Sequence, residues 1–483
     1  MRLCHSALLS LLVALCLVDL SWAQGDRWKR LRDEDNRLYQ QGKYSEGIPT
    51  AQEALRVAET TFGPGSAKVA LSLNDLGMLY AGAANYPEAE SAYKRSAAII
   101  EKLVGSRSPV FAKSLNNLAA LYQTEGKFAD SEIVFKRSVG ILEKSLGPDD
   151  PTLGRALNNL AEVYRTEAKY QEAQLLYERA LAIAQKARAD PDVAACLNNM
   201  AELNRLQGKY ADAETLFRRS LAIMEKSLGA EHPSIASILN NLAVVCQSEG
   251  KYAEAEDFQK RALAIQQKVL GPDHTSVARS LNNLAELYRM EHKYAEAEPL
   301  YAQSSAIVEK KLGPDHPFYA TSLSNQALNY QGEHKYAEAE PLLKRSLQIQ
   351  EKALGPDHPD LAKSLNNLAE LYRSEGKYDD AEPLYKRTLA IDEKVLGPEH
   401  PDVTVCQSNL AVLYESEGKY EEAEALYKRA LAIEEKTLGT NHPDVARILS
   451  NYSVLLRKTN RTVEADGMAA RAKAILAKQA QSN

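Results

Sequence analysis

The sequence predicts an all-α solenoid of about eleven stacked helix pairs, and two recurring landmarks support this prediction. The first landmark is Asn-Asn-Leu-Ala or a close variant, which recurs every 42 residues along most of the chain. The second is Gly-Lys-Tyr or a relative of it, which falls once between successive copies of the first. A fixed period of this length is typical of repeat proteins, in which each unit buries its apolar face against its neighbours.

The unit at residues 358–397 illustrates why each repeat is expected to form two helices. Pro359 stands at a first-turn position, where a missing backbone N–H is not needed. Apolar residues then recur at three- and four-residue steps, which places them on one face of a helix that ends at Gly376. A second helix with its own apolar face runs from about Tyr378 and stops at Leu396-Gly397-Pro398.

One unit of the array is irregular. The segment from Lys186 to Pro191 lacks Leu-Gly-Pro and is two residues short. Either it changes the superhelical pitch at this point, or it is a loop of tolerated length, because loops accept insertions and deletions readily.

The first 23 residues have the pattern of an export signal. Arg2 is followed by an apolar run from Leu8 to Val18, and Ser21-Trp22-Ala23 supplies small residues for cleavage. The run is too short to span a bilayer, which takes roughly 20 residues, although an uncleaved anchor is the alternative. We expect a signal peptide over 1–23, a repeat array over 24–480 with degenerate first and last repeats, and a short tail over 481–483. The mature chain would be extracytoplasmic, either periplasmic or secreted.

The composition excludes some classes of function. The chain has 59 Lys and Arg against 65 Asp and Glu, a net charge of −6, whereas a nucleic-acid binder needs a basic face. No later apolar stretch has membrane length, so no membrane insertion of the mature chain is expected. Cys196, Cys246 and Cys406 are odd in number and lie within predicted helices, so we predict buried free thiols.

The repeat motifs point to a family. The pattern Asn-Asn-Leu-Ala-x-Leu-Tyr, Gly-Lys-Tyr-x-x-Ala-Glu, Leu-Tyr-x-Arg-Ala-Leu-x-Ile and Leu-Gly-Pro-x-His-Pro resembles the long tetratricopeptide repeat of kinesin light chains and their bacterial relatives. The resemblance covers about residues 27–480. It implies a right-handed superhelix whose first helices line a concave groove, with asparagines that contact a bound peptide. Kinesin light chains are cytoplasmic, so their motor and cargo are not carried over to this chain, which looks like an exported bacterial-type relative.

A polar stripe lies beside the apolar face of each first helix, as in Lys363, Asn366, Glu370 and Arg373. An asparagine offers donors and an acceptor, which suits the backbone of an extended peptide. Alternatively, one asparagine of each pair bonds the adjacent repeat and holds the stack. The asparagines predicted to line the peptide groove are Asn116, Asn117, Asn158, Asn159, Asn198, Asn199, Asn240, Asn241, Asn282, Asn283, Asn366 and Asn367.

Charges on this stripe follow a rule. Four repeats carry Glu and Arg three residues apart, which stabilises a helix by roughly 0.2–0.5 kcal/mol: Glu162/Arg165, Glu202/Arg205, Glu286/Arg289 and Glu370/Arg373. We therefore expect the groove residues Arg165, Arg289 and Arg373 to be largely neutralised by their own helices. Repeats with an apolar residue at the Glu position would place small apolar patches in the groove, at Ala120, Val244, Leu328 and Val412. Single exposed apolar residues are ordinary, however, so a solvated face is the alternative.

No catalytic constellation is present in the sequence. It contains no Gly-x-Ser-x-Gly, no Walker phosphate loop and no His-Glu-x-x-His. One loop histidine per repeat is expected to serve as a turn and cap residue, because a metal site needs several converging ligands. We predict a non-enzymatic scaffold or adaptor, without cofactor or metal, that binds extended segments of a protein partner. The alternative is a holdase-like chaperone or an assembly factor of an extracytoplasmic complex.

Overall fold

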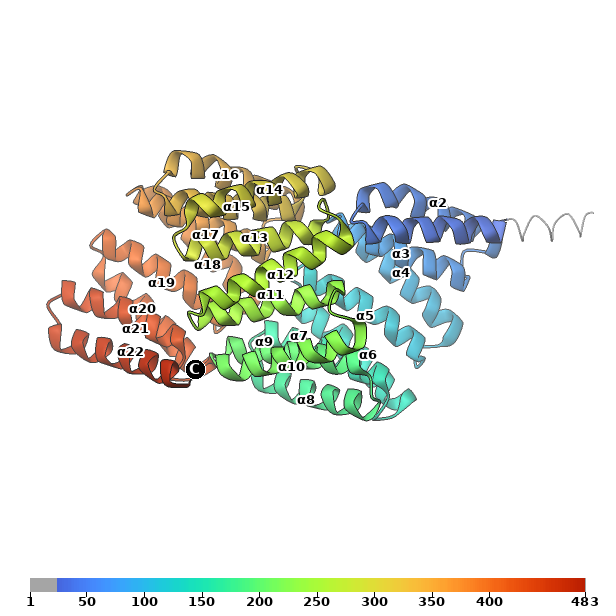
Figure 1. Ribbon diagram of the computed structural model, residues 1–483, viewed down its shortest axis with the longest axis horizontal. Coiled ribbons are helices and arrows are strands. Elements are labelled where there is room, and N and C mark those ends of the chain that lie inside the picture. Colours follow the sequence, from blue (N-terminus) through green and yellow to red (C-terminus); the bar gives the residue numbers. More distant parts are fainter. Residues whose placement is uncertain (1–23, 483) are drawn as a thin grey trace, which may run out of the picture. The chain divides into compact units, whose positions relative to one another are not determined.

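The computed structural model describes residues 24–482, and this part of the chain consists of helices and connecting turns without a strand. Residues 24–40 are helical and pair with α2, and ten further pairs of antiparallel neighbours follow, which confirms the predicted solenoid (Figure 1). The helices are α2 (Tyr44–Phe62), α3 (Ala67–Gly82), α4 (Tyr86–Val104), α5 (Pro109–Thr124), α6 (Phe128–Leu146), α7 (Pro151–Thr166), α8 (Tyr170–Lys186), α9 (Asp190–Leu206), α10 (Tyr210–Leu228), α11 (Pro233–Ser248), α12 (Tyr252–Leu270), α13 (Thr275–Met290), α14 (Tyr294–Leu312), α15 (Pro317–Gly332), α16 (Tyr336–Leu354), α17 (Pro359–Ser374), α18 (Tyr378–Leu396), α19 (Pro401–Ser416), α20 (Tyr420–Thr437), α21 (Pro443–Lys458) and α22 (Thr462–Ser482).

The chain divides into two compact units. The first comprises residues up to Leu121 together with 133–147, and the second comprises 122–132 together with everything from Pro148 onward. The turn between α5 and α6 therefore belongs to the second unit. The predicted signal peptide over 1–23 lies outside the described residues, and α22 continues past residue 480 to Ser482.

The core is a row of small clusters between neighbouring helices. Ala369 of α17 and Ala381 of α18 are both fully buried, and they share a cluster with Tyr385 of α18 and with Leu410 and Leu413 of the following helix. Such a cluster belongs to two repeats at once, so each repeat is completed by its neighbour. The three cysteines of the described residues are buried and free, as predicted.

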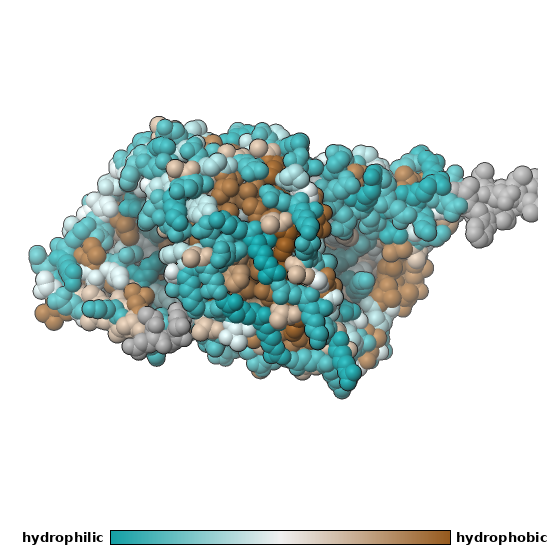
Figure 2. Space-filling view, viewed as in Figure 1, coloured by the Kyte–Doolittle hydropathy of each residue, from teal (hydrophilic) through white to brown (hydrophobic). Residues whose placement is uncertain are grey.

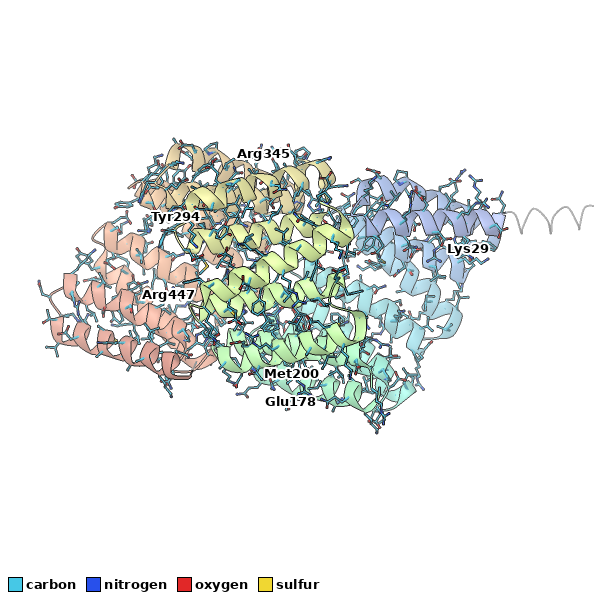
Figure 3. The ribbon with its side chains drawn as sticks, in the orientation of Figure 1. Lys29, Glu178, Met200, Tyr294, Arg345 and Arg447 are labelled. Atoms are coloured by element: carbon cyan, nitrogen blue, oxygen red, sulfur yellow. The ribbon has the colours of Figure 1, made fainter. Side chains whose placement is uncertain are left out.

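Salt bridges between repeats tie the second helices to the preceding loops. Arg345, labelled on α16 in Figure 3, reaches the Asp315 carboxylate at 3.0 Å, and Lys352 reaches the same carboxylate at 2.8 Å. These side chains are well exposed, and pairs of this kind contribute little stability, with a median of about 0–1 kcal/mol. No helix among the described residues is both long and apolar enough to cross a membrane.

The loop histidines cap the first helices, as predicted. In each, the ring Nδ1 accepts a hydrogen bond from the backbone N–H two residues later, which satisfies one of the donors left open at a helix start. In α19, for example, Nδ1 of His400 lies 3.1 Å from the Asp402 nitrogen. The capping histidines are His232, His274, His316, His358, His400 and His442.

In the second unit, the last three capping histidines also touch a much earlier part of the chain. Nε2 of His358 lies 3.0 Å from the Thr124 carbonyl oxygen, and Nε2 of His400 lies 2.9 Å from that of Thr166. Nε2 of His442 lies 3.1 Å from the carbonyl oxygen of Leu206. A carbonyl can only accept, so Nε2 carries the hydrogen and donates. We call these three bonds the turn-to-turn contacts, since each joins one turn of the superhelix to the previous one.

Backbone packing accompanies these contacts. Gly126, in the turn after α5, has a φ of 71°, and an added Cβ would lie 2.6 Å from Cδ of Pro359. No side chain fits at this position unless the two turns of the superhelix move apart.

The repeat that is two residues short, at Lys186 to Pro191, leaves the turn-to-turn contacts intact. Thr124, Thr166 and Leu206 all stand at the ends of first helices, and the contacts span 234, 234 and 236 residues. The two missing residues are absorbed within this separation, because α8 has 17 residues where α10 has 19. The loop between α8 and α9 is therefore a tolerated shortening, because contacts of the same kind form on both sides of it.

The contribution of buried His442 to stability is expected to fall in acid. Burial lowers the pKa of His442, against the opposing effects of Asp444 and of the hydrogen bond to Leu206, so the folded state favours the neutral ring. The stabilisation is then complete above the unfolded-state pKa of about 6.5 and is lost as pH falls below it. We expect the difference in free energy of unfolding between the wild type and His442→Asn to shrink between pH 7.5 and pH 5. Urea titrations of both proteins at each pH measure it, and a constant difference would contradict the assignment.

Candidate functional site

The asparagine stripe forms a ladder of hydrogen bonds between repeats. The second asparagine of one pair donates from Nδ2 to Oδ1 of the first asparagine in the preceding repeat. Asn199 bonds Asn158 at 3.2 Å, and Asn241 bonds Asn198 at 3.1 Å. The same bond joins Asn325 to Asn282 at 3.0 Å, Asn409 to Asn366 at 2.9 Å, and Asn117 to Asn74 in the first unit. In each of these repeats, therefore, at least one asparagine bonds an adjacent repeat, and Asn198 and Asn199 both do so.

Five of the predicted asparagines lie outside this ladder: Asn116, Asn159, Asn240, Asn283 and Asn367. None of the residues that the structure describes hydrogen-bonds the side-chain amides of Asn159, Asn283 and Asn367. The expected partner of Asn283 is Asn240, which is buried and directs Nδ2 to Ser280 Oγ at 3.4 Å. The expected partner of Asn367 is replaced by Ser324, which bonds Ser346 instead at 2.8 Å. We call Asn159, Asn283 and Asn367 the free-amide asparagines. In the first unit, Asn116 has a buried Oδ1 without a partner.

The predicted pairing of Glu and Arg is present and is stronger than a surface pair. Arg373 meets Glu370 through both Nε, at 3.0 Å, and Nη2, and Tyr385 of the next helix donates to the same carboxylate at 2.8 Å. Bidentate pairs of this kind fix geometry as well as charge. Arg165 and Arg289 are held in the same way by Glu162 with Tyr177 and by Glu286 with Tyr301.

The tyrosines of these networks are buried, and burial raises the pKa of Tyr177, Tyr301 and Tyr385 well above the ordinary value. They therefore remain hydrogen-bond donors to the glutamates. The sequence places them on the apolar face of the second helix, but it does not reveal that each hydroxyl reaches a glutamate of the first helix. Because Arg165, Arg289 and Arg373 are engaged within their own repeats, they are poorly placed to bind an acidic ligand.

The predicted apolar patches are only partly exposed. Val244, Leu328 and Val412 are half-buried, and Val412 packs against the cluster that contains Tyr427 and Tyr452. Ala120 in the first unit is exposed. Figure 2 shows hydrophobic residues gathered in several small areas of a mainly hydrophilic surface. The side chains of Val244, Leu328 and Val412 therefore lie at the edges of the core, and they offer a partner only a limited apolar area.

Two hollows open on the asparagine stripe of the second unit. The smaller, about 220 Å³, lies among α7, α8 and α9 and is lined by Asn158 and Asn159. The larger, about 370 Å³, lies among α17, α18 and α19 and is lined by Asn366 and Asn367. Each therefore contains one ladder asparagine and one free-amide asparagine. Among the predicted groove residues, these two pairs each line a hollow.

The larger hollow, which we call the α17–α19 hollow, has a wall from the previous superhelical turn. Phe128, at the start of α6, and Thr166, at the end of α7, line it together with residues of α17 to α19. Two acidic residues line it, Asp392 of α18 and Asp402 of α19. The pKa of Asp392 is raised to about 7 by burial and by the nearby Asp402, against the effect of Lys363. No group of His, Cys, Asp and Glu within residues 24–482 is arranged to hold a metal ion.

Comparison with known families identifies the repeats. The tetratricopeptide repeat model matches over residues 38–102, 110–186, 192–268, 234–310, 276–345, 319–394, 367–433 and 402–478. The chain belongs to the tetratricopeptide repeat family. Tetratricopeptide arrays build extended binding surfaces from stacked units, and the fold is that of a scaffold for protein–protein interaction.

Solved structures include similar tetratricopeptide arrays. Nearly identical TPR-like repeats from Podospora anserina, described as those of a kinesin light chain, are 34% identical over 43% of this chain and 98% of theirs, with a TM-score of 0.36. BtubC (BKLC) from P. vanneervenii is 22% identical over 48% of this chain and 91% of its own, with a TM-score of 0.38. A Rap protein in complex with competence and sporulation factor is 17% identical over 77% of this chain and 98% of its own, with a TM-score of 0.51, which shows a shared fold. A search of curated proteins gives no significant match.

Proposed function

We propose that this tetratricopeptide protein is a non-enzymatic scaffold that binds an extended segment of a partner protein along its asparagine stripe. The observation that carries the proposal is the set of free-amide asparagines. An amide with no partner inside the protein can bond the backbone of a bound segment, whereas the ladder asparagines already bond one another. Two of the three free amides, Asn159 and Asn367, line hollows that open on the stripe.

The ion pairs of Arg165, Arg289 and Arg373 further restrict which kind of segment the stripe can bind. Because glutamates of the same helices neutralise these arginines, the groove attracts an acidic segment only weakly. We therefore expect the backbone of the partner and its uncharged or basic side chains to supply the contacts. The fold class supports a protein partner rather than a small-molecule substrate.

A photocrosslinking residue tests where the partner lies. It is placed at position 283 in one variant and at position 345, on the outer side of α16 (Figure 3), in another. In an extracytoplasmic extract we expect a discrete partner to crosslink at position 283 and not at position 345. Equal crosslinking at both positions would contradict binding along the stripe. An excess of unrelated unfolded protein is expected to leave the crosslink unchanged, and loss of the crosslink would favour a holdase instead.

Replacing Asn159, Asn283 and Asn367 together by alanine is expected to reduce affinity for the captured partner roughly 100-fold. Each lost bond contributes about 1 kcal/mol, and about 1.4 kcal/mol corresponds to a factor of ten in affinity. Calorimetric titration measures the loss. The melting temperature of this variant should match the wild type, because these amides hold no other described residue.

The matched control changes two ladder asparagines, Asn199→Ala with Asn241→Ala, and the opposite pattern is expected. It removes two bonds between repeats at 3.2 and 3.1 Å, so it should lower the urea midpoint while it leaves affinity nearly unchanged at a temperature where the variant is folded. A loss of stability in the free-amide variant equal to that of the control would show that both sets are structural.

We also propose that the scaffold works outside the cytoplasm. The proposal rests on the pattern of Arg2, the apolar run and Ser21-Trp22-Ala23. Amino-terminal sequencing of the protein recovered from its native source should begin near Gln24, and recovery of an intact Met1 from the cytoplasmic fraction would contradict it.

A further inference from the structure

The two hollows on the asparagine stripe are equivalent positions of two repeats. Nine of the ten residues that line the smaller hollow have a counterpart of similar type in the α17–α19 hollow. The counterparts are Pro151 and Pro359, Gly154 and Ala362, Arg155 and Lys363, Asn158 and Asn366, Asn159 and Asn367, Ala180 and Thr388, Asp192 and Asp402, Ala195 and Val405, and Cys196 and Cys406. The smaller hollow can therefore be compared with the α17–α19 hollow position by position, and the differences show what is particular to the larger one.

The remaining position differs in charge. Ala184 lines the smaller hollow, and Asp392 takes its place in the larger one. No hydrogen bond or ion pair joins Asp392 to any described side chain. The other acid at this position of a repeat is Glu434, whose carboxylate accepts a hydrogen bond from Thr404. Asp392 is therefore a partly buried carboxylate that the fold leaves without a partner.

The charges at the rim of the two hollows also differ. In the smaller hollow, Nη1 of Arg155 lies 2.8 Å from Oδ2 of Asp192 and neutralises it. In the α17–α19 hollow, Nζ of Lys363 instead lies 3.0 Å from Oδ1 of Asp360 on its own helix, and its side chain is 76% exposed. Among the described residues, the one basic group within ion-pair distance of the Asp402 carboxylate is Nδ1 of His400, at 3.9 Å. Two carboxylates, Asp392 and Asp402, therefore face this hollow while its lysine is engaged elsewhere.

The walls suit a cation with an apolar stem. Phe128 supplies an aromatic side chain, and Pro359 and Leu396 supply aliphatic surface. Carboxylates with an aromatic neighbour favour ammonium and guanidinium groups, since the ring face also attracts cations. The volume of about 370 Å³ falls within the range of roughly 300–1,000 Å³ that is usual for ligand pockets. The previous superhelical turn is held beside the hollow by the bonds of His358 and His400 to Thr124 and Thr166.

We infer that the α17–α19 hollow binds the side chain of a lysine or arginine from the bound segment, with its charged group at Asp392 and Asp402 and its backbone at Asn367. The inference rests on the proposed function, because it assigns one anchor residue of the partner. It also orients the segment, since the smaller hollow at Asn159, with its neutralised rim, would accept an uncharged side chain.

The experiment uses the purified chain from residue 24 and two small probes. N-acetyl-arginine methylamide carries the guanidinium, and N-acetyl-citrulline methylamide is its neutral counterpart of the same shape. We expect the arginine probe to bind at millimolar concentration in a calorimetric or NMR titration, and the citrulline probe to bind at least ten times more weakly. Asp392→Asn should abolish that preference. Glu393→Gln, which changes the next residue along α18, is the matched control and should retain it.

The melting temperature of each variant serves as the control that the variant is folded. Asp392→Asn removes a buried charge that has no partner, so this variant should be at least as stable as the wild type at pH 8. Arginine binding is also expected to rise with pH through about 7, as Asp392 ionises. The groups that face Asp392 during this titration are Lys363 of α17 and Asp402 and Cys406 of α19.

The possible outcomes separate the inference from the proposed function. Equal binding of the arginine probe to wild type and Asp392→Asn would overturn the inference. Binding of spermidine without binding of the arginine probe would overturn it too, since the site would then take a free polyamine. If the captured partner binds Asp392→Asn as tightly as the wild type but is lost by the free-amide variant, the inference fails while the proposed function stands. Loss of the arginine preference in Asp392→Asn supports the inference whether or not a partner has been captured.

Discussion

Gln407→Leu is expected to raise the free energy of unfolding of the second unit by about 2–4 kcal/mol. Gln407 lies in α19, it is fully buried, and neither Nε2 nor Oε1 has a hydrogen-bond partner. Each unsatisfied buried polar group costs about 1–3 kcal/mol, and an apolar side chain of similar size removes both. The first helices of the other repeats carry leucine at this position: Leu73, Leu115, Leu157, Leu197, Leu239, Leu281, Leu323, Leu365 and Leu449. The core around it is therefore already shaped for leucine.

Urea unfolding followed by circular dichroism, with hydrogen exchange across α19, measures the effect. The matched control is Gln185→Leu at an exposed position of α8, which should change stability by less than about 0.5 kcal/mol. A loss of stability on Gln407→Leu would show that the amide is satisfied in solution, for instance by a buried water.

The triple variant His358→Asn, His400→Asn and His442→Asn is expected to lose about 3 kcal/mol or more of stability. Asparagine is a good N-cap, so each first helix keeps its start, but its shorter side chain cannot reach Thr124, Thr166 or Leu206. Three backbone carbonyls then lose a donor at about 1 kcal/mol or more each. The wall that the previous turn contributes to the α17–α19 hollow should become more mobile as well.

Hydrogen exchange over residues 122–132 and 164–170 measures that mobility, and thermal unfolding measures the stability. His232→Asn is the matched control, because His232 caps α11 in the same way through Ser234. Its Nε2 makes no hydrogen bond to any residue that the structure describes. Equal losses in the control and in a single variant such as His400→Asn would show that the cap matters and the turn-to-turn contact does not.

The fold follows from the sequence because every repeat carries its own start and stop signals. His358-Pro359 and Leu396-Gly397 mark helix ends that the structure places where the pattern predicts them, and Gly376 lies in the turn just after α17 ends at Ser374. Local signals of this kind act within a few residues, so reading them requires no knowledge of the superhelix. The neutralisation of Arg373 by Glu370 was predictable for the same reason, since both lie on one helix.

The site was less predictable, because it depends on how repeats are offset from one another. Whether an asparagine joins the ladder depends on the residue at the facing position of the preceding repeat. Asn199 faces Asn158 and bonds it, whereas Asn367 has no such bond. Asn325 and Asn409 were missed because their repeats carry Ser-Asn in place of Asn-Asn, although each donates to the ladder. Asp392 could have been noticed as an acid at a position where most repeats are apolar or amide, but Phe128 reaches the α17–α19 hollow only through the return of the superhelix.

The turn-to-turn contacts change how cooperative the array should be. A solenoid with contacts only between adjacent units behaves as a one-dimensional chain, in which folding starts anywhere and spreads by neighbours. Bonds that span 234 residues add a coupling between distant units and raise the contact order, which slows folding. The repeats around α7 and α19, which the bond of His400 to Thr166 joins, should then melt together rather than fray in sequence. A chain truncated before α17 should lose cooperativity in repeats that it still contains.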